Sequence, residues 1–260
     1  MAGSRLTPSR PCRKMVAPIP SPFPSRSDPL PMDVTEKAQT AARGRRIRRE
    51  NVERILKAAE LVFAEAGCAG ATMADIADKA GLPKANLHYY FGTKEDLYRA
   101  VLDNILRLWL DPLAGLDASA DPATALTAYI RAKMDASRLR PNASKVFANE
   151  ILHGASQIGE FLAEDLRRLV DRKAAVIEQW ISEGRMAPVD PRQFFFMIWS
   201  MTQHYADFEV QVRTVLGRKK LTRDDFAHFT AEVVRMVLRA GGLAPPDDPV
   251  SCTGGVPGES

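Results

Sequence analysis

The segment Pro83–Phe91, which reads PKANLHYYF, carries several side chains that can hydrogen-bond to nucleic acid. A lysine donates to guanine acceptors or to phosphate, an asparagine amide pairs with a base edge, and a tyrosine hydroxyl reaches a phosphate oxygen. If the segment is helical, Leu87 and Phe91 lie one turn apart and face inward. The other faces then carry Lys84, Asn86, His88 and Tyr89. Statistics of helix faces alone would favour an ordinary solvated surface, so the interpretation depends on the neighbouring elements.

A second set of residues could bind a flat, polar molecule. Trp199 and Gln203 lie one turn apart in the strongly apolar stretch Phe194–Phe208. The Gln203 amide offers both a donor and an acceptor, and a buried amide needs partners for them. One interpretation is that Gln203 pairs with a planar ligand lying against Trp199, with Trp109 from another helix as the second wall. The alternative is that Gln203 bonds His204 or a backbone carbonyl and that both tryptophans are ordinary core residues.

The elements that must position the first set are three short helices with tight turns. From Arg49 onwards, apolar residues recur every three or four positions until Gly67 closes the first helix. Thr72 is placed to cap a second helix that Gly81 ends, and Pro83 suits the start of the third helix because it lacks an N–H. Two helices joined by such a turn form a candidate helix-turn-helix, whose second helix can lie in the major groove of DNA.

The rest of the chain also has the spacing of helices. Thr93 and Asp96 have the spacing of a capping box and open an apolar-striped helix that reaches Leu110. Further helices are expected at roughly 122–139, 143–153, 159–184, 191–214 and 222–240. No segment shows a convincing strand pattern. The fold class is therefore all-α, with an N-terminal three-helix helix-turn-helix domain and a C-terminal helical domain.

The charge of this chain of 260 residues is unevenly distributed, although its formal net value is only +4. Residues 1–94 hold 16 Lys and Arg against 9 Asp and Glu, a net +7, whereas residues 95–260 hold 20 against 23, a net −3. A basic N-terminal part followed by a near-neutral remainder is typical of a domain that binds a polyanion joined to a domain that does not. An arm ahead of the first helix, which could follow a minor groove or phosphates, consists of Arg43, Arg45, Arg46, Arg48 and Arg49.

Several classes of function find little support in the sequence. The longest uncharged stretch of the most apolar region, Gln193–Ala206, is too short to span a membrane, and the proline-rich N-terminus has no apolar secretory segment, so a cytoplasmic location is expected. Three scattered cysteines argue against a disulfide framework and a zinc site, and neither a metal nor a cofactor is expected. An enzyme using His153 or His204 with Asp207 is one rival, but no nucleophile elbow, phosphate loop or metal spacing accompanies these residues, and the expectation is that the chain is not an enzyme.

The second half is expected to make a homodimer. Helix 222–240 places apolar residues at core-like spacing and, with helix 191–214, could form a four-helix seam with a second copy. In a dimer, two DNA-binding domains that lie one groove repeat apart can recognise both halves of a palindromic site, which a single domain cannot do. The alternative is that helix 222–240 merely completes the core of the monomer. The expected domains are a disordered Pro/Arg-rich extension over 1–44, the helix-turn-helix domain over 45–94, the ligand-binding and dimerisation domain over 95–240 and a flexible tail over 241–260.

Residues of about 50–97 resemble the DNA-binding domain of the TetR family of transcriptional regulators. The resemblance is carried by ATMADIA at 71–77 and GLPKANLHYYFGTK at 81–94, and the YYF-x-x-K ending at Lys94 makes it specific. It implies that phosphates are held by Thr72, Tyr89 and Lys94. It also implies that bases are approached by Lys84, Ala85 and His88.

The sensor half is similar to that of pyrimidine-responsive members of the family, for example at WLDPL (109–113) and MIWSMTQHYADF (197–208). This similarity implies that Trp109, Trp199 and Gln203 bind uracil or thymine, whose flat ring stacks on indole and whose edge alternates N–H and C=O groups. The expected function is a repressor that holds a palindromic operator in double-stranded DNA and leaves it when the effector moves the 94–117 helix. An architectural or nonspecific DNA-binding protein without a ligand remains the alternative.

Overall fold

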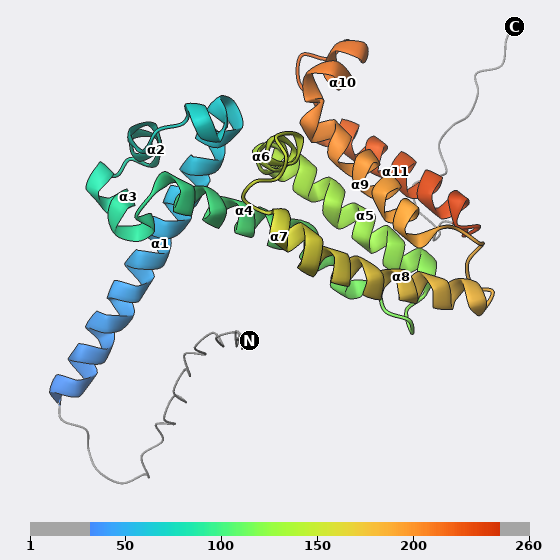
Figure 1. Cartoon of the computed structure of the whole chain (residues 1–260), viewed down its shortest axis with the longest axis horizontal. Helices are drawn as coiled ribbons and strands as arrows, with labels where there is room; N and C mark the ends of the chain where they lie inside the picture. The colour runs from blue at the N-terminus through green and yellow to red at the C-terminus, as the bar shows by residue number, and fades with distance from the viewer. Residues whose placement is uncertain (1–31, 245–260) are drawn as a thin grey trace, which may run out of the picture. The chain divides into compact units, whose positions relative to one another are not determined.

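The computed structural model describes residues 32–244, and every regular element in that range is a helix (Figure 1). The absence of strands from these residues confirms the all-α fold class. The chain divides into two compact units, residues 1–47 and residues 48–260. The predicted tail lies almost wholly outside the described residues, from residue 245 on, as does the predicted extension up to residue 31.

Helix α1 (Met32–Gly70) begins well before Arg49, where the apolar periodicity starts. The predicted disordered extension over 1–44 therefore differs from the structure in its last part, because residues from Met32 to Gly44 are helical. Pro31 is the last proline of the extension, and the residues after it are rich in the helix formers alanine, glutamate, lysine and glutamine. Such a helix has no apolar stripe, so the periodicity of the sequence does not detect it.

The helix-turn-helix consists of α2 (Met73–Ala80) and α3 (Lys84–Phe91). Thr72 caps α2 in a capping box with Asp75, and Gly81 ends the helix in the left-handed conformation with φ of 62°. Pro83 directly precedes the first helical residue of α3. The predicted start, end and order of these helices are therefore confirmed to within a residue.

The long helix α4 (Lys94–Leu110) follows, opened by the predicted capping box of Thr93 and Asp96. A 3-10 turn, η1 (Asp111–Gly115), ends it. The sensor half then contains α5 (Pro122–Leu139), α6 (Pro141–Leu152), α7 (Gly159–Phe161), the π-helical turn η2 (Leu162–Leu166), α8 (Arg167–Ser182), α9 (Pro191–Asp207), α10 (Glu209–Val215) and α11 (Arg223–Ala240). The helix predicted at 191–214 is interrupted at Phe208, whose backbone leaves the helical conformation.

Helix α5 is central in the sensor half, since it contacts α4, α6, α9 and α11 (Figure 1). Two apolar clusters hold the described residues together. One joins the DNA-binding head, which consists of α2, α3 and the end of α1, to α4 and α6, with Ile55, Leu87, Leu102 and Val146 among its buried members. The other fills the sensor half, with Ile130, Trp180, Phe195 and Val237 among its buried members. Among residues 32–244, no helix is both long and apolar enough to cross a membrane.

Candidate DNA-binding head and effector pocket

Helix α3 presents most of its predicted contact residues to solvent. Leu87 is fully buried and anchors the helix to the head, and Asn86 is half-buried. Tyr89 is 74% exposed, which leaves its ring and hydroxyl open to a partner. The remaining exposed contact residues are Lys84, Ala85 and His88. The structure therefore brings these predicted residues together on one short helix.

The first helix holds both helices of the reading head in place. On α1, the Asn51 amide Nδ2 donates to the Tyr90 hydroxyl at 3.2 Å. One turn further on, Arg54 Nη2 donates to the Ala80 carbonyl at 2.7 Å, at the end of α2. These contacts fix one side of α3 through Tyr90 and leave Tyr89 on the outside. The rings of Tyr89 and Tyr90 meet edge-on, with 5.1 Å between their centroids.

Thr72 and Lys94 lie at the beginnings of α2 and α4. The Thr72 hydroxyl donates to Asp75 Oδ2 at 2.7 Å, and the Lys94 ammonium donates to the Ala71 carbonyl at 3.2 Å. Lys94 thereby ties the start of α4 to the residue before Thr72. Helix beginnings expose unpaired N–H groups and the positive end of the helix dipole, which suit a phosphate. An ammonium has three donors, so one hydrogen bond to Ala71 leaves others available.

His88 and the arginine arm complete the predicted DNA-contact set. His88 Nδ1 lies 2.8 Å from the Gly92 carbonyl oxygen. A carbonyl can only accept, so Nδ1 is the donor and Nε2 remains at the exposed surface. Arg45 and Arg46 belong to the other compact unit, where both are exposed on α1. Their contribution to the same DNA site stays a prediction.

The interior of the sensor half contains a lysine that sequence reasoning missed. Lys133 on α5 is 3% exposed, and its ammonium lies 4.1 Å from the centroid of the Trp109 ring. Burial lowers the pKa of Lys133 from 10.5 to about 7, while the charge of Asp207 acts in the opposite direction. The sequence carried a signal for this position: Leu126, Ile130 and Met134 follow the core face of α5, and Lys133 falls on that face.

Asp207, at the end of α9, is the acidic counterpart of this lysine. Burial raises the pKa of the Asp207 carboxyl, and the nearby groups Ser144, Lys145, His204 and Lys133 oppose that shift. From the sequence, Asp207 is expected to act only in the rival enzyme site. The structure places it half-buried in the sensor half, where its charge acts on the buried lysine of α5.

Several buried side-chain atoms of the sensor half have no hydrogen-bond partner. Among the described residues, such atoms include Trp109 Nε1, Ser144 Oγ and Asp207 Oδ1. Ser144 lies close enough to Asp207 to lower the pKa of its carboxyl, but the two groups do not complete a hydrogen bond of good geometry. Because buried polar groups are almost always paired in folded proteins, these atoms are candidates for hydrogen bonds to a polar ligand.

The two remaining predicted ligand residues lie on α9. The Trp199 indole donates to the Tyr129 hydroxyl at 2.8 Å, and Tyr129 is one turn before Lys133 on α5. Gln203, one turn after Trp199, is half-buried and makes no hydrogen bond to another residue in the range 32–244. The alternative in which Gln203 bonds His204 or a backbone carbonyl is therefore not the arrangement found. The candidate ligand residues come from α4, α5, α6 and α9.

Helix α6 connects these candidate ligand residues to the DNA-binding head. Directly before its first residue, Arg140 forms an ion pair with Glu60 of α1 and donates to Asn104 of α4 at 2.9 Å. Near its other end, the buried Glu150 carboxylate accepts a hydrogen bond from the Tyr98 hydroxyl of α4 at 3.1 Å. Ser144 lies between these two contacts, beside Asp207. A shift of α6 would therefore be felt by both α1 and α4.

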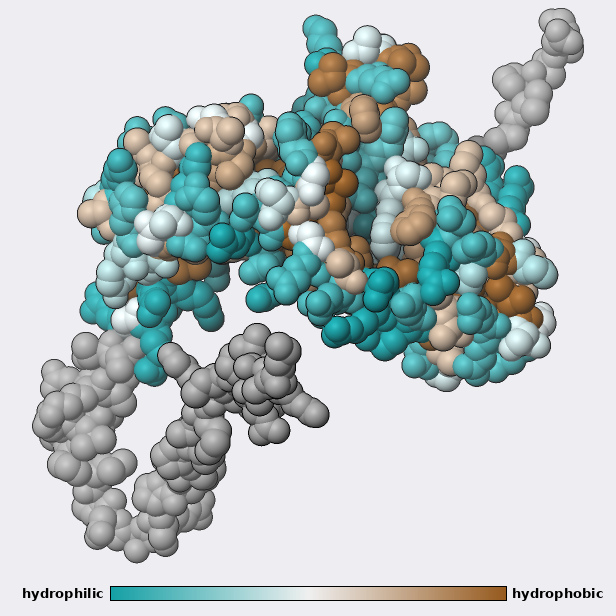
Figure 2. All heavy atoms as spheres, in the orientation of Figure 1, coloured by the Kyte–Doolittle hydropathy of each residue, from teal (hydrophilic) through white to brown (hydrophobic). Residues whose placement is uncertain are grey.

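An exposed apolar face on α9 to α11 is the structural counterpart of the predicted dimer seam. Phe196, Met197 and Met236 are 48%, 58% and 56% exposed, although they are large apolar side chains. Further apolar side chains gather over α10, which includes the 80% exposed Val215 (Figure 2). Contiguous exposed apolar surface marks an interaction site. In residues 32–244, no group of histidine, cysteine and acidic side chains is arranged to hold a metal ion.

Comparisons with known proteins agree with this architecture. The family model described as "Bacterial regulatory proteins, tetR family" matches residues 55–101, and the one described as "YcdC-like protein, C-terminal region" matches residues 102–244. The chain therefore belongs to the TetR family of bacterial transcriptional regulators. One similar relative is the HTH-type transcriptional regulator RutR of Escherichia coli strain K12, which is 43% identical over 187 residues, 72% of this chain and 88% of RutR. The predicted family is confirmed.

Solved structures share the fold. The ketosteroid transcriptional regulator KstR2 of Mycobacterium tuberculosis superposes with a TM-score of 0.60 at 21% identity, covering 73% of this chain and 94% of KstR2. AibR, solved in complex with isovaleryl coenzyme A and operator DNA, gives a TM-score of 0.55 at 21% identity, covering 76% of this chain and all of AibR, 100%. At such identities the likeness concerns the fold alone.

Proposed function

We propose that this regulator is a homodimeric repressor that holds a palindromic DNA operator and releases it on binding an oxo-pyrimidine such as uracil or thymine. The observation that carries the proposal is that the buried Lys133 lies over the Trp109 ring and that buried polar atoms of Trp109, Ser144 and Asp207 have no hydrogen-bond partner. Trp199 and Gln203 lie on the same helix as Asp207. The similarity to RutR supports the same ligand class. The site of action is the cytoplasm, where bacterial DNA lies, and the chain acts by binding rather than by catalysis.

The chemistry of the pocket suits the edge of a uracil ring. Uracil presents alternating carbonyl and N–H groups, and each needs a partner when it leaves water. The Lys133 amine and the Trp109 indole N–H are donors for its carbonyl oxygens. The Asp207 carboxylate is an acceptor for a ring N–H, and the amide of Gln203 can serve as either. The indoles of Trp109 and Trp199 supply apolar walls for the flat ring.

The proposed DNA contacts follow from the exposed surface of the head. Thr72, Tyr89 and Lys94 hold phosphates at the edges of the groove, which positions the helix without reading sequence. Base edges are approached by Lys84, Ala85, Asn86 and His88. Arg45 and Arg46 add contacts to phosphates or to the minor groove from the arm. Two such heads in a dimer read the two halves of a palindrome.

The ligand acts on the heads through α6 as well as α4. A ligand that engages Asp207 and Ser144 pulls on the middle of α6, whose ends contact α1 through Glu60 and α4 through Tyr98. A ligand that contacts Trp109, near the end of α4, also acts directly on the helix that starts at Lys94. A ligand weakens DNA binding only as far as it prefers the non-binding conformation, typically by about 1–3 kcal/mol of coupling.

The test is the affinity for a genomic DNA fragment selected by the protein itself, measured at one salt concentration with and without uracil. We expect uracil to weaken binding by about 5–150-fold and cytosine, which has an amino group in place of one carbonyl, to have little effect. Gln203→Ala should remove the response to uracil and leave DNA binding intact, while Gln193→Ala, on the exposed side of α9, serves as the matched control. No response to any pyrimidine would reject the ligand assignment.

One other function has an observation in its favour. The exposed arginines of α1, among them Arg45 and Arg48, would also serve an architectural protein that binds DNA through phosphates alone. Competition with random DNA separates the two functions. Equal affinity for selected and random fragments would support the architectural role.

A further inference from the structure

Lys133 occupies the middle of a polar stripe on the buried face of α5. Tyr129, one turn before it, accepts a hydrogen bond from the Trp199 indole of α9 at 2.8 Å. Ser137, one turn after it, donates to the Thr202 carbonyl of α9 at 2.7 Å. Lys133 is 3% exposed, yet in the described part of the chain it takes part in no hydrogen bond or ion pair. The middle position of the stripe therefore lacks the kind of partner that its two neighbours have.

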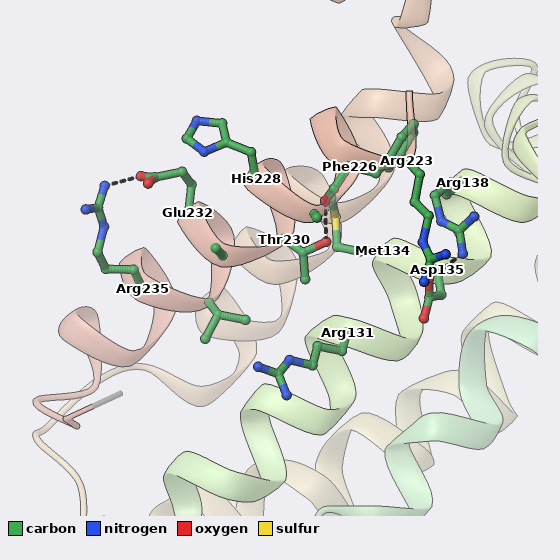
Figure 3. A pocket seen from close by; sticks show the side chains of 13 residues that line it. Arg131, Met134, Asp135, Arg138, Arg223, Phe226, His228, Thr230, Glu232 and Arg235 are labelled. Carbon is green, nitrogen blue, oxygen red and sulfur yellow. Dashed lines mark hydrogen bonds and ion pairs between the residues drawn. The ribbon is translucent and has the colours of Figure 1, made fainter. Parts of the chain in front are cut away.

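The stripe is also separate from the open surface of α5. Together with α11, this helix lines a surface groove, to which it contributes Arg131 and Arg138 (Figure 3). None of the stripe residues Tyr129, Lys133 and Ser137 lines that groove. The lysine is therefore enclosed by protein and does not obtain its missing hydrogen bonds from the solvent in the groove.

The Lys133 ammonium lies over an aromatic ring instead. Its Nζ atom is 4.1 Å from the centroid of the Trp109 ring, a distance at which the face of the ring attracts a cation. An ammonium has three donors, however, and the ring face does not replace the hydrogen bonds that water gives them. Burial without such bonds makes the charged form costly, and for this reason the pKa of Lys133 falls to about 7.

The charges around Lys133 do not supply what it lacks. In residues 32–244, Asp207 of α9 is the one charged group whose charge shifts the pKa of Lys133, and it favours the ammonium. Burial raises the pKa of the Asp207 carboxyl itself, which limits the negative charge that this group offers. From α4 the lysine meets the uncharged Trp109, and Tyr129 of α5 is kept neutral because burial raises its pKa. The groups that act on Asp207 in turn are Ser144 and Lys145 of α6 and His204 of α9.

We propose that Lys133 takes up a proton when the effector binds, because a carbonyl oxygen of the ligand becomes the acceptor that its ammonium lacks. This inference rests on the proposed function, since it concerns the same interior residues and an oxo-pyrimidine ligand. An acceptor beside the amine favours the charged form. The amine nitrogen gains its proton from the solvent, and the ligand stays neutral. Effector binding is then tighter at lower pH, so the regulator leaves DNA at a lower effector concentration when the pH falls.

Isothermal titration of uracil into the full chain measures this proton uptake directly. At about pH 7.5, the binding enthalpies in phosphate and in Tris give the number of protons exchanged, because the two buffers differ in ionisation enthalpy. We expect wild type to take up about half a proton or more and to bind uracil about tenfold more weakly at pH 8.5 than at pH 7. Uracil itself stays largely neutral over this range, so its own ionisation does not produce the change.

Three variants assign the proton to the lysine. Lys133→Met should bind uracil more weakly, with the same affinity at both pH values and without proton uptake. Lys133→Arg carries a permanently charged donor and should also bind uracil without proton uptake. The matched control is Lys219→Met, in the exposed loop after α10, which should behave as wild type does. Urea unfolding of each variant verifies that it is folded.

The outcomes separate this inference from the function on which it rests. Uracil binding without proton uptake, or with equal affinity at the two pH values, would overturn the role of Lys133 and leave the proposed function in place. Net release of a proton would identify the Asp207 carboxyl as the titrating group, and uptake that persists in Lys133→Met would assign the proton elsewhere; both results overturn the inference. Absence of uracil binding at every pH would reject the proposed function and this inference with it.

Discussion

Replacing the buried lysine by methionine tests the electrostatics of the pocket. Burial lowers the pKa of Lys133 from 10.5 in the unfolded chain to about 7 in the fold, so the unfolded state binds the proton more tightly. The free-energy cost of burying the charged amine is fully present below about pH 7 and decreases as the pH rises towards 10.5. A shift of this size corresponds to about 5 kcal/mol of lost stability at low pH, at 1.36 kcal/mol for each pKa unit.

Lys133→Met keeps most of the volume and removes the charge, so we expect this variant to be more stable than wild type. By linkage, the gain in the free energy of unfolding should be about 5 kcal/mol at pH 6 and about 2 kcal/mol at pH 9. Urea unfolding of both proteins at the two pH values measures it, and other titrating groups largely cancel in the difference.

Lys57→Met, at an exposed position of α1, controls for the general effect of exchanging lysine for methionine. The gain in the free energy of unfolding for Lys133→Met must exceed that of the control variant at pH 6 and must decrease towards pH 9. A gain of equal size at both pH values, or a loss of stability at pH 6, would refute the argument that the fold carries a costly buried amine. The same variant should bind uracil more weakly, because a donor for a carbonyl oxygen is lost.

Three further predictions concern the head, the connection and the dimer. Lys84→Ala should weaken operator binding by about 1–3 kcal/mol and relax the sequence preference at one base pair, as fluorescence anisotropy with a set of mutated operators would show; an equal loss on all sequences would mean a phosphate contact instead. Arg140→Gln breaks the ion pair with Glu60 and should reduce the uracil effect on DNA affinity by about 0.5–2 kcal/mol, while calorimetry finds the affinity for uracil unchanged; an unaltered effect would exclude this route. Met197→Glu places a charge in the exposed apolar face and should shift the protein to monomers in sedimentation, with weaker operator binding; a stable dimer would place the seam elsewhere.

The sequence was sufficient for most of the fold because its local patterns are strong. The cap at Thr72, the capping box at Thr93, the helix end at Gly81 and the helix ranges predicted for α4 and α5 each agree with the structure. The helix from Met32 was not predicted, because an exposed helix without an apolar stripe has no periodicity to detect. The interruption at Phe208 was not predicted either, since no glycine or proline marks it.

The candidate pocket was predicted only in part. Trp109, Trp199 and Gln203 attracted attention by residue type, because aromatic and amide side chains in an apolar helix are unusual. Lys133 was missed because a lysine on an amphipathic helix is expected to point to solvent, and only its place on the apolar face of α5 contradicts that expectation. The electrostatic interaction of Lys133 with Asp207 depends on the packing of α5 against α9. The two residues are 74 positions apart, so no local pattern in the sequence reveals it.

The central claim is that a small oxo-pyrimidine in the interior pocket releases the regulator from DNA. The most direct measurement is a titration of uracil into the complex of the full chain with its selected genomic fragment, followed by fluorescence anisotropy, for wild type and for Gln203→Ala. The account predicts that uracil dissociates the wild-type complex and leaves the variant complex bound. Dissociation of both complexes, or of neither, would contradict it.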